Sequence, residues 1–166
     1  SPPLSVLAIT FLCLAQVFSM PMPCKLQRHL VGTTYLLLRD MGGHFPLECL
    51  QENVFMAFPA TAFASSDRQL YDAIYNIDTL FRTDELPTMW DQQKLEYFQN
   101  IIYRQIEESE CILSLCKKKL HFLNSTFLFS QNFTYCAWEV VRKEILYTLE
   151  FILIHHSDSL LWSNRT

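Results

Sequence analysis

The sequence predicts an all-α fold in which four to five helices pack as one bundle. Five stretches repeat their apolar residues at the spacing of an α-helix, and none shows the alternation of apolar and polar residues that marks a half-buried strand. Half of the residues are hydrophobic and 14% are aromatic, which is enough apolar material to fill such a bundle. Glycine occurs only three times, which argues against a doubly wound nucleotide-binding fold with its glycine-rich loop.

An apolar segment opens the chain, and we interpret residues 1–19 as a secretory signal peptide that is cleaved near residues 19–23. The run from Val6 to Ser19 carries no charge and ends in small or polar residues. Because it is shorter than the roughly 20 residues of a transmembrane helix, we expect no membrane insertion. An N-terminal core helix or anchor is the alternative. The remaining residues, 20–166, are predicted to form a single secreted, extracellular domain.

The first bundle helix is predicted from about residue 25 to residue 41, where Gly42-Gly43 ends it. Its apolar stripe consists of Leu26, Leu30, Leu37 and Met41. The connection that follows, residues 44–66, contains two prolines and is rich in phenylalanine. We expect three of these rings to be tucked in against the bundle: Phe45, Phe55 and Phe58. A connection of this length can cross the whole bundle, which allows the first two helices to run parallel.

Two strongly periodic helices come next. The second helix begins at a cap provided by Ser66 or Asp67, and Pro87-Thr88 breaks it off. Its apolar stripe is Leu70, Ile74, Ile77 and Phe81. Asp91 starts the third helix, whose stripe is Leu95, Phe98, Ile102, Ile106 and, beyond them, Leu113. Three acids are expected on the outer face of this helix: Glu107, Glu108 and Glu110.

A weaker helix is predicted over residues 117–129, and the last helix contains the motif YCAWEVVRKE, Tyr135 to Glu144. Its apolar stripe is Trp138, Val141, Ile145, Leu149 and Ile152. Glu139, Arg142 and Lys143 are then placed on the polar face, where Glu139 can form a surface ion pair with either base. The alternative is that Arg142 is presented to a partner.

The cysteines and three glycosylation motifs fit an oxidising compartment. Cys13 lies in the signal segment and would be removed with it. The other five cysteines are expected to form two disulfides and to leave one thiol. The pattern Asn-x-Ser/Thr predicts glycosylation at Asn124, Asn132 and Asn164.

Other classes of function fit less well. The net charge of −4 argues against binding to nucleic acid, and the short basic run Lys117–Lys119 is interpreted as a solvated helix turn. Cys111, Cys116 and His121 could form a zinc site, but their spacing is not that of the usual ligand pairs. Nothing orients a Cys/His nucleophile, so we predict no enzyme, no metal and no cofactor. A secreted helical lipid carrier, with its phenylalanines lining a cavity, is an alternative.

Two motifs resemble a known family. CAWEVVR-x-E, Cys136 to Glu144, resembles the last-helix signature of type I interferons, and GGHFPLECLQENV, residues 42–54, resembles the fish members of that family. The resemblance covers essentially all of residues 20–166. It implies a bundle of the long-chain helical cytokine type with a long first crossover connection. Another class of secreted helical cytokine is the alternative, and the last-helix motif argues against it.

The resemblance also implies a function. Members of the type I interferon family are secreted antiviral cytokines without catalysis or cofactor. One cytokine, expected here to be a monomer, bridges the two chains of a class II cytokine receptor on the cell surface. Janus kinases and STAT transcription factors are activated as a result, and antiviral genes are induced.

The pairing of the cysteines is likewise implied by the resemblance, as Cys24–Cys111 and Cys49–Cys136. Cys116 would then be free, be an alternative partner of Cys24, or link two chains. The second bridge would attach the long connection to the last helix. In the family these two elements together form one receptor face.

The resemblance assigns receptor contacts as well. It places Arg142 against the high-affinity receptor chain, with Glu139 and Lys143 beside it. Tyr147 stands where many mammalian relatives carry a second basic contact. The second receptor chain would bind helices two and three, where we expect exposed contacts at Asp72, Asn76, Gln99 and Arg104.

Overall fold

The computed structural model of the chain describes residues 3–18, 24–55, 66–115 and 131–162. Within these ranges the structure contains helices and no named strand, which confirms the predicted all-α class. The α-helices are α1 (Leu4–Phe18), α2 (Arg28–Gly42), α3 (Asp67–Leu80), α4 (Gln92–Glu108) and α6 (Tyr135–His155). The 3-10 helices are η1 (Leu47–Glu52), η3 (Glu110–Leu115) and η4 (Ser157–Ser159). The helix predicted over residues 117–129 lies outside the described residues.

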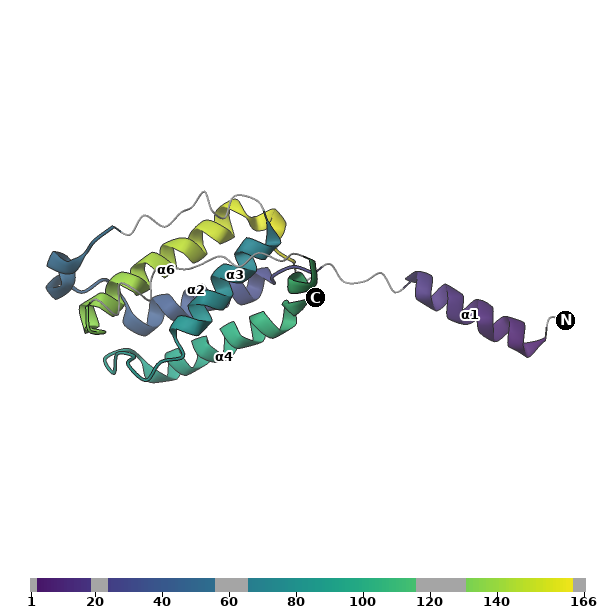
Figure 1. Ribbon diagram of the computed structural model, residues 1–166, viewed down its shortest axis with the longest axis horizontal. Coiled ribbons are helices and arrows are strands. Elements are labelled where there is room, and N and C mark those ends of the chain that lie inside the picture. Colours follow the sequence, from purple (N-terminus) through teal and green to yellow (C-terminus); the bar gives the residue numbers. More distant parts are fainter. Residues whose placement is uncertain (1–2, 19–23, 56–65, 116–130, 163–166) are drawn as a thin grey trace.

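Four α-helices, α2, α3, α4 and α6, pack side by side as the bundle (Figure 1). Figure 1 also shows that α2 and α3 run in one direction and α4 and α6 in the other. Contacts at the helix ends agree with this arrangement, because Arg28 at the start of α2 donates to the carbonyl of Leu153 near the end of α6. Helices α2 and α3 thus run parallel, as a connection of this length allows.

Three helices of the bundle begin at a side-chain cap. The side chains of Ser66, Asp91 and Thr134 each accept a hydrogen bond from the backbone N–H three residues further on, at 3.3, 3.0 and 3.3 Å. Of the two candidates for the second helix, Ser66 is the cap. Gly43 follows α2 with φ of 66°, a left-handed conformation that glycine adopts readily at the end of a helix.

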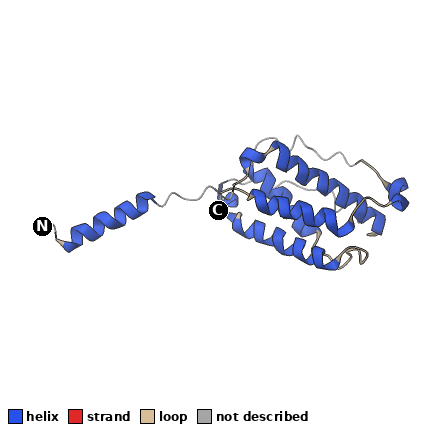
Figure 2. Cartoon of the chain, turned by 180° about the vertical axis from the view of Figure 1, so that it is seen from behind, coloured by secondary structure: helices blue, strands red, loops and turns tan. Residues whose placement is uncertain are grey.

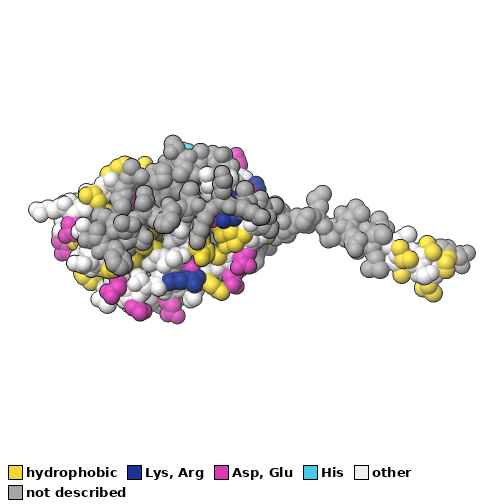
Figure 3. Space-filling view, in the orientation of Figure 1, with side chains coloured by type: hydrophobic (Ala, Val, Ile, Leu, Met, Phe, Trp, Pro, Cys, Tyr) yellow, Lys and Arg dark blue, Asp and Glu magenta, His cyan; other side chains and the backbone are white. Residues whose placement is uncertain are grey.

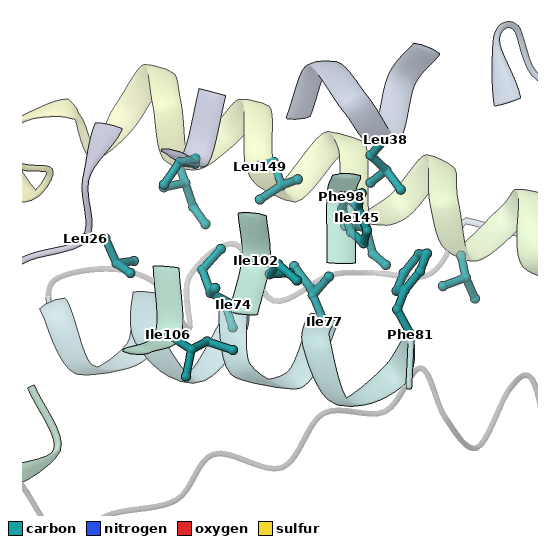
Figure 4. Packing of buried hydrophobic residues seen from close by; sticks show 14 of the residues in the cluster. Leu26, Leu38, Ile74, Ile77, Phe81, Phe98, Ile102, Ile106, Ile145 and Leu149 are labelled. Carbon is teal, nitrogen blue, oxygen red and sulfur yellow. The ribbon is translucent and has the colours of Figure 1, made fainter. Parts of the chain in front are cut away.

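The core lies between the four helices and contains most residues of the predicted stripes (Figure 4). Figure 4 shows Ile145 and Leu149 of α6 pointing toward Ile77 of α3 across the interior. An aromatic cluster extends one end of this core, since the ring centroids of Phe81 and Trp138 are 5.6 Å apart. Phe81, which follows α3, and Phe98 of α4 thus pack against other rings in the core.

Three predictions about apolar residues need correction. In the first helix Leu38 is fully buried, while Leu37 is only partly buried. Leu113 is 42% exposed, because it follows the end of α4 and lies in η3, where the helical stripe no longer continues. Phe55 is 80% exposed, so it is not tucked in; Phe45 is half-buried, and Phe58 lies outside the described residues.

Helix α1 lies apart from the bundle (Figures 1 and 2). Its side chains from Leu4 to Phe11 are exposed although most of them are apolar. An apolar helix whose described side chains are all exposed supports the interpretation as a signal peptide, which stays a prediction. In the part of the chain that the structure describes, no helix is both long enough and apolar enough to cross a membrane.

Candidate functional site

Helix α6, which carries the motif YCAWEVVRKE, is enclosed on more than one side. Its five predicted stripe residues are all fully buried: Trp138, Val141, Ile145, Leu149 and Ile152. Beyond this stripe, four polar side chains of the helix are buried as well: Glu139, Arg142, Glu144 and Thr148. The first half of the helix therefore has no continuous polar face that is exposed to solvent.

The prediction that Glu139 and Arg142 lie on the surface is wrong. Their side chains are 0% and 2% exposed, and Arg142 Nη2 lies 2.7 Å from Glu139 Oε2. They do form the expected ion pair at i, i+3, but the pair is inside the bundle. Arg142 is therefore not available for direct contact with a receptor chain, and the same holds for Glu139.

The buried pair is held by two segments distant in sequence. Trp90, in the loop before α4, donates its indole N–H to Glu139 Oε1 at 2.5 Å. The guanidinium of Arg142 donates to the carbonyls of Leu38 and Arg39, both at 3.2 Å, and of Gly43 at 2.9 Å. These carbonyls lie at the C-terminal end of α2, where the helix dipole favours a nearby positive charge. Sequence reasoning missed Trp90 and this role of the α2 end.

The long connection after α2 is attached to α6 at two places, first at Cys49 and then at Asn53 and Val54. Cys49 of η1 forms a disulfide with Cys136, with Cα atoms 5.2 Å apart. Lys143 Nζ donates to Asn53 Oδ1 at 2.6 Å and to the carbonyl of Val54 at 3.2 Å. The part of the connection from Cys49 to Val54 is thus fixed against α6.

The two disulfides of the structure are the pairs that the family resemblance implies. Besides Cys49–Cys136, Cys24 is bonded to Cys111, with Cα atoms 5.9 Å apart. Both pairs have a sequence separation of 87 residues. Closing loops of that length stabilises a folded chain by about 4–5 kcal/mol per bridge when only the entropy of the unfolded chain is counted. Cys116 lies outside the described residues.

An exposed surface remains where α6 and the connection meet, and we call Lys143, Tyr147, Leu50 and Phe55 the α6–connection surface. Tyr147 is 63% exposed and lies one helical turn after Lys143, on the same side of α6. Leu50 and Phe55 are 55% and 80% exposed. A tyrosine and apolar side chains that protrude from a rigid support are typical of the central part of a protein interface.

The four residues expected on helices two and three differ in their surroundings. Asp72 is buried and paired with Arg68 at 2.9 Å, so the prediction that it is exposed is wrong. Asn76 is half-buried, and Gln99, also half-buried, donates to the carbonyl of Phe81 at 2.9 Å. Arg104 is exposed and paired with Glu108.

Aromatic and acidic side chains surround these residues on α3 and α4. Tyr75 and Tyr103 are 44% and 47% exposed, and the guanidinium of Arg82 lies 5.6 Å from the ring centre of Tyr103. The hydrogen bond of Tyr103 to Glu107 raises the pKa of its phenol. Figure 3 shows acidic side chains along the lower edge of the molecule, where α4 lies in Figure 1. The predicted outward position of Glu107, Glu108 and Glu110 is confirmed.

One of the three glycosylation motifs can be located. Asn132 is exposed in the turn before α6, and its φ is 50°. Thr134, the third residue of that motif, is also the cap of α6. The motifs at Asn124 and Asn164 lie outside the described residues.

The geometry weakens two of the alternative functions. Cys111 is bonded to Cys24, so its sulfur cannot bind zinc as the enzyme alternative requires, and Cys116 and His121 lie outside the described residues. Among the described residues, the groove between α2 and the end of α6 is open to solvent, so this groove is not the enclosed cavity that a lipid carrier would need. That groove has a volume of about 470 Å³ and is lined in part by Arg28, Leu153 and Trp162.

Comparison with known proteins agrees with the resemblance of the motifs. Residues 24–156 match the family model of the interferon alpha/beta domain. Interferon a3 of Oncorhynchus mykiss is 32% identical over 154 residues, which cover 81% of this chain and 86% of the relative. Interferon alpha-10 of Homo sapiens is 28% identical over 150 residues, which cover 75% of this chain and 79% of the relative.

A solved structure shows the same fold. Zebrafish interferon 2 superposes with a TM-score of 0.70 at 35% identity, over 79% of this chain and 99% of that chain. The chain therefore belongs to the type I interferon family, whose members are secreted cytokines and not enzymes, and it is similar to the fish members of that family.

Proposed function

We propose that this chain is a secreted antiviral cytokine that binds the two chains of a class II cytokine receptor and brings them together at the cell surface. The observation that carries the proposal is the attachment of the long connection to α6 by Cys49–Cys136 and by Lys143. A surface made from two segments is useful for binding only if the segments keep their relative position, and a covalent bridge provides this. Membership of the family supplies the class of partner.

The first receptor chain is proposed to bind the α6–connection surface. Tyr147 provides the largest exposed aromatic group of α6, and Leu50 and Phe55 provide apolar groups on the connection. Lys143 contributes at the edge while it holds Asn53 and Val54 in place. Arg142 and Glu139 act from the interior and do not touch the receptor.

The second receptor chain is proposed to bind α3 and α4 through Asn76, Gln99 and Arg104. Arg104 already forms an ion pair with Glu108, which a receptor carboxylate would have to replace. Such an exposed pair is worth only about 0–1 kcal/mol, so its exchange is inexpensive. Tyr75 and Tyr103 lie on the same two helices and add exposed aromatic area.

Secretion belongs to the same proposal. Residues 1–19 are a signal peptide, the mature chain is a monomer, and Asn124, Asn132 and Asn164 carry glycans. The two disulfides support an oxidising compartment, because such bonds are rare in reducing ones.

The test uses the full chain expressed in cultured fish cells. Protein purified from the medium is first shown to be helical by circular dichroism and to contain both disulfides by peptide mass spectrometry. It is then mixed with the soluble ectodomains of paired class II cytokine receptor chains, and complex masses are measured by analytical ultracentrifugation. STAT phosphorylation and virus yield are measured in cells with and without a Janus kinase inhibitor.

We expect a complex of one cytokine with two different receptor chains, and STAT phosphorylation that the inhibitor abolishes. Reduced and alkylated protein serves as the matched control and should form no such complex. The proposal is wrong if the natively folded chain binds only one receptor chain or none, or if it accumulates inside the cells.

A further inference from the structure

The start of the long connection is held by one buried side chain. Arg142 donates to Gly43, the residue at which the chain leaves α2, and to the carbonyls of Leu38 and Arg39 before it. Its charge is balanced inside the bundle by Glu139. A guanidinium suits this position because its planar group presents several donors in a fixed geometry, whereas a lysine would offer a single ammonium.

Gly42 leaves the space that the guanidinium of Arg142 occupies. A Cβ atom built on Gly42 would lie 2.6 Å from Cζ and from Nε of Arg142, which is much closer than nonbonded atoms approach. Any larger residue at position 42 would therefore push the guanidinium away from the carbonyls. Gly32 provides a contrast in the same helix, because a Cβ atom there meets nothing within 4 Å.

Three successive points of the connection are thus held by the first turns of α6. Arg142 holds Gly43, Cys136 holds Cys49, and Lys143 holds Asn53 and Val54. The disulfide joins the connection at one residue and leaves its entry direction from α2 open. Arg142 is the side chain that fixes this entry.

We infer that Arg142 is a positioning residue for the α6–connection surface. Together with Gly42 it sets the direction in which the connection leaves α2, and so the placement of η1 beside α6. The inference rests on the proposed function for its receptor readout. It assigns the effect of Arg142 on binding to the geometry of residues 43–55, with no contact between Arg142 and the receptor.

The experiment compares three secreted full-chain variants with the wild type. Gly42→Ala displaces the guanidinium while keeping every charge. Glu139→Gln with Arg142→Met removes the buried pair without leaving one charge alone, which keeps the fold accessible if Arg142→Ala does not fold. The third variant adds Gly42→Ala to that double replacement. Arg39→Ala is the matched control, since Arg39 is an exposed arginine at the same end of α2 and pairs with Asp40 at the surface.

Amide hydrogen exchange of residues 43–55 is the first readout, with α4 as the internal reference. Gly43, Cys49 and Asn53 donate backbone hydrogen bonds that report on the connection. In Gly42→Ala and in the double replacement we expect exchange at these amides to be about tenfold faster, and unchanged within α4. Arg39→Ala should leave both regions as in the wild type.

Binding to each receptor chain is the second readout. Affinity for the chain that binds the α6–connection surface should fall about tenfold or more in Gly42→Ala, and affinity for the other chain should stay the same. Adding Gly42→Ala to the double replacement should cause no further loss, because no guanidinium is left to displace. A general loss of stability would not produce this dependence.

The two proposals fail in different ways. Unchanged exchange of residues 43–55 in both Gly42→Ala and the double replacement overturns the positioning role, whatever the receptor does. A further affinity loss from Gly42→Ala when Arg142 is absent also overturns it. If the wild type binds neither receptor chain, the proposed function is wrong, while the exchange data still decide the role of Arg142.

Discussion

Trp90 and Glu139 are joined by a hydrogen bond of 2.5 Å in the interior of the bundle, although 49 residues separate them in the sequence. Trp90 is 2% exposed and Glu139 is fully buried. Because Glu139 also binds Arg142, which in turn binds the end of α2, one polar cluster connects α6, α2 and the loop before α4. A buried polar cluster of this kind is stabilising only while each member keeps its partners.

Replacement of Trp90 by Phe is predicted to destabilise the fold by about 1–3 kcal/mol, because Glu139 loses its neutral donor and the smaller ring leaves a space. The measurement is equilibrium unfolding in urea of the purified chain. Trp162→Phe is the control, since Trp162 is 63% exposed, and it should change the unfolding free energy by no more than about 0.5 kcal/mol. Equal effects of the two replacements would contradict the role of the cluster.

The apolar part of this arrangement could be predicted from the sequence, and the polar part could not. A stripe such as Trp138, Val141 and Ile145 follows from helical period alone, and the structure buries it. Period alone also puts Glu139 and Arg142 beside the stripe, and charged side chains there are usually solvated. They are buried here because α2 and the Trp90 loop cover that side of α6.

The same reason explains the errors at Asp72 and Phe55. Asp72 lies close to a stripe, and its burial depends on the course of neighbouring segments, which a helical pattern does not contain. Phe55 was expected inside because it is apolar, but the connection is held outside α6 at Asn53 and Val54, and the ring that follows points to solvent. Long-range contacts of loops are the information that periodicity lacks.

Replacement of Gly32 by Ala is predicted to stabilise the fold by about 0.5–1 kcal/mol. Gly32 lies inside α2, where alanine has the higher helix propensity, and its Cβ would meet no atom within 4 Å. Gly43→Ala is the contrasting variant and should destabilise by about 1 kcal/mol, since Gly43 has φ of 66°. Thermal unfolding followed by circular dichroism measures the change in melting temperature for both variants. A melting temperature of Gly32→Ala below that of the wild type would contradict the predicted stabilisation.

Removal of one disulfide by the double replacement Cys49→Ser and Cys136→Ser is predicted to destabilise the fold by about 2–5 kcal/mol. The bridge spans 87 residues, so its loss frees a large loop in the unfolded chain. Unfolding in urea with and without a reductant is the measurement, and the Cys24–Cys111 bridge should remain in the oxidised sample. If the variant and the wild type unfold at the same urea concentration under oxidising conditions, the pairing is wrong.

Asp91 is predicted to make the stability of the fold depend on pH, because its carboxylate caps α4. The backbone N–H of Lys94, with its ammonium group next, lowers the pKa of Asp91 from its ordinary value of 3.8. A carboxyl group whose pKa is lower in the folded chain stabilises folding above its unfolded pKa, and that contribution disappears as the pH falls through the folded value.

The variant Asp91→Asn keeps a capping side chain but cannot titrate. Its melting temperature should be lower than that of the wild type at about pH 7, and the difference should vanish as the pH is lowered to about 2. Glu96→Gln, which removes an exposed carboxylate of the same helix away from the cap, reports the effect of net charge alone. A difference between Asp91→Asn and the wild type that persists unchanged at low pH would rule out the capping charge as its source.

Tyr147 is predicted to dominate binding of the first receptor chain. Arg142 is buried, and Tyr147 is the most exposed aromatic side chain of α6, one turn after the lysine that fixes the connection. Tyr147→Ala should weaken binding of that chain by more than about 1 kcal/mol, since tyrosines are over-represented among the residues that carry binding energy. Surface plasmon resonance with the soluble receptor chain measures the change, and circular dichroism checks that the helix content is retained.

Tyr97→Ala is the matched control for this prediction. Tyr97 is 59% exposed on α4, so its removal deletes a similar exposed ring from a helix that does not contribute to the α6–connection surface. Affinity for the first receptor chain should stay at the wild-type value. If Tyr147→Ala behaves like Tyr97→Ala, the first receptor chain does not use this part of α6, and the exposed apolar groups of the connection, Leu50 and Phe55, become the residues to replace next.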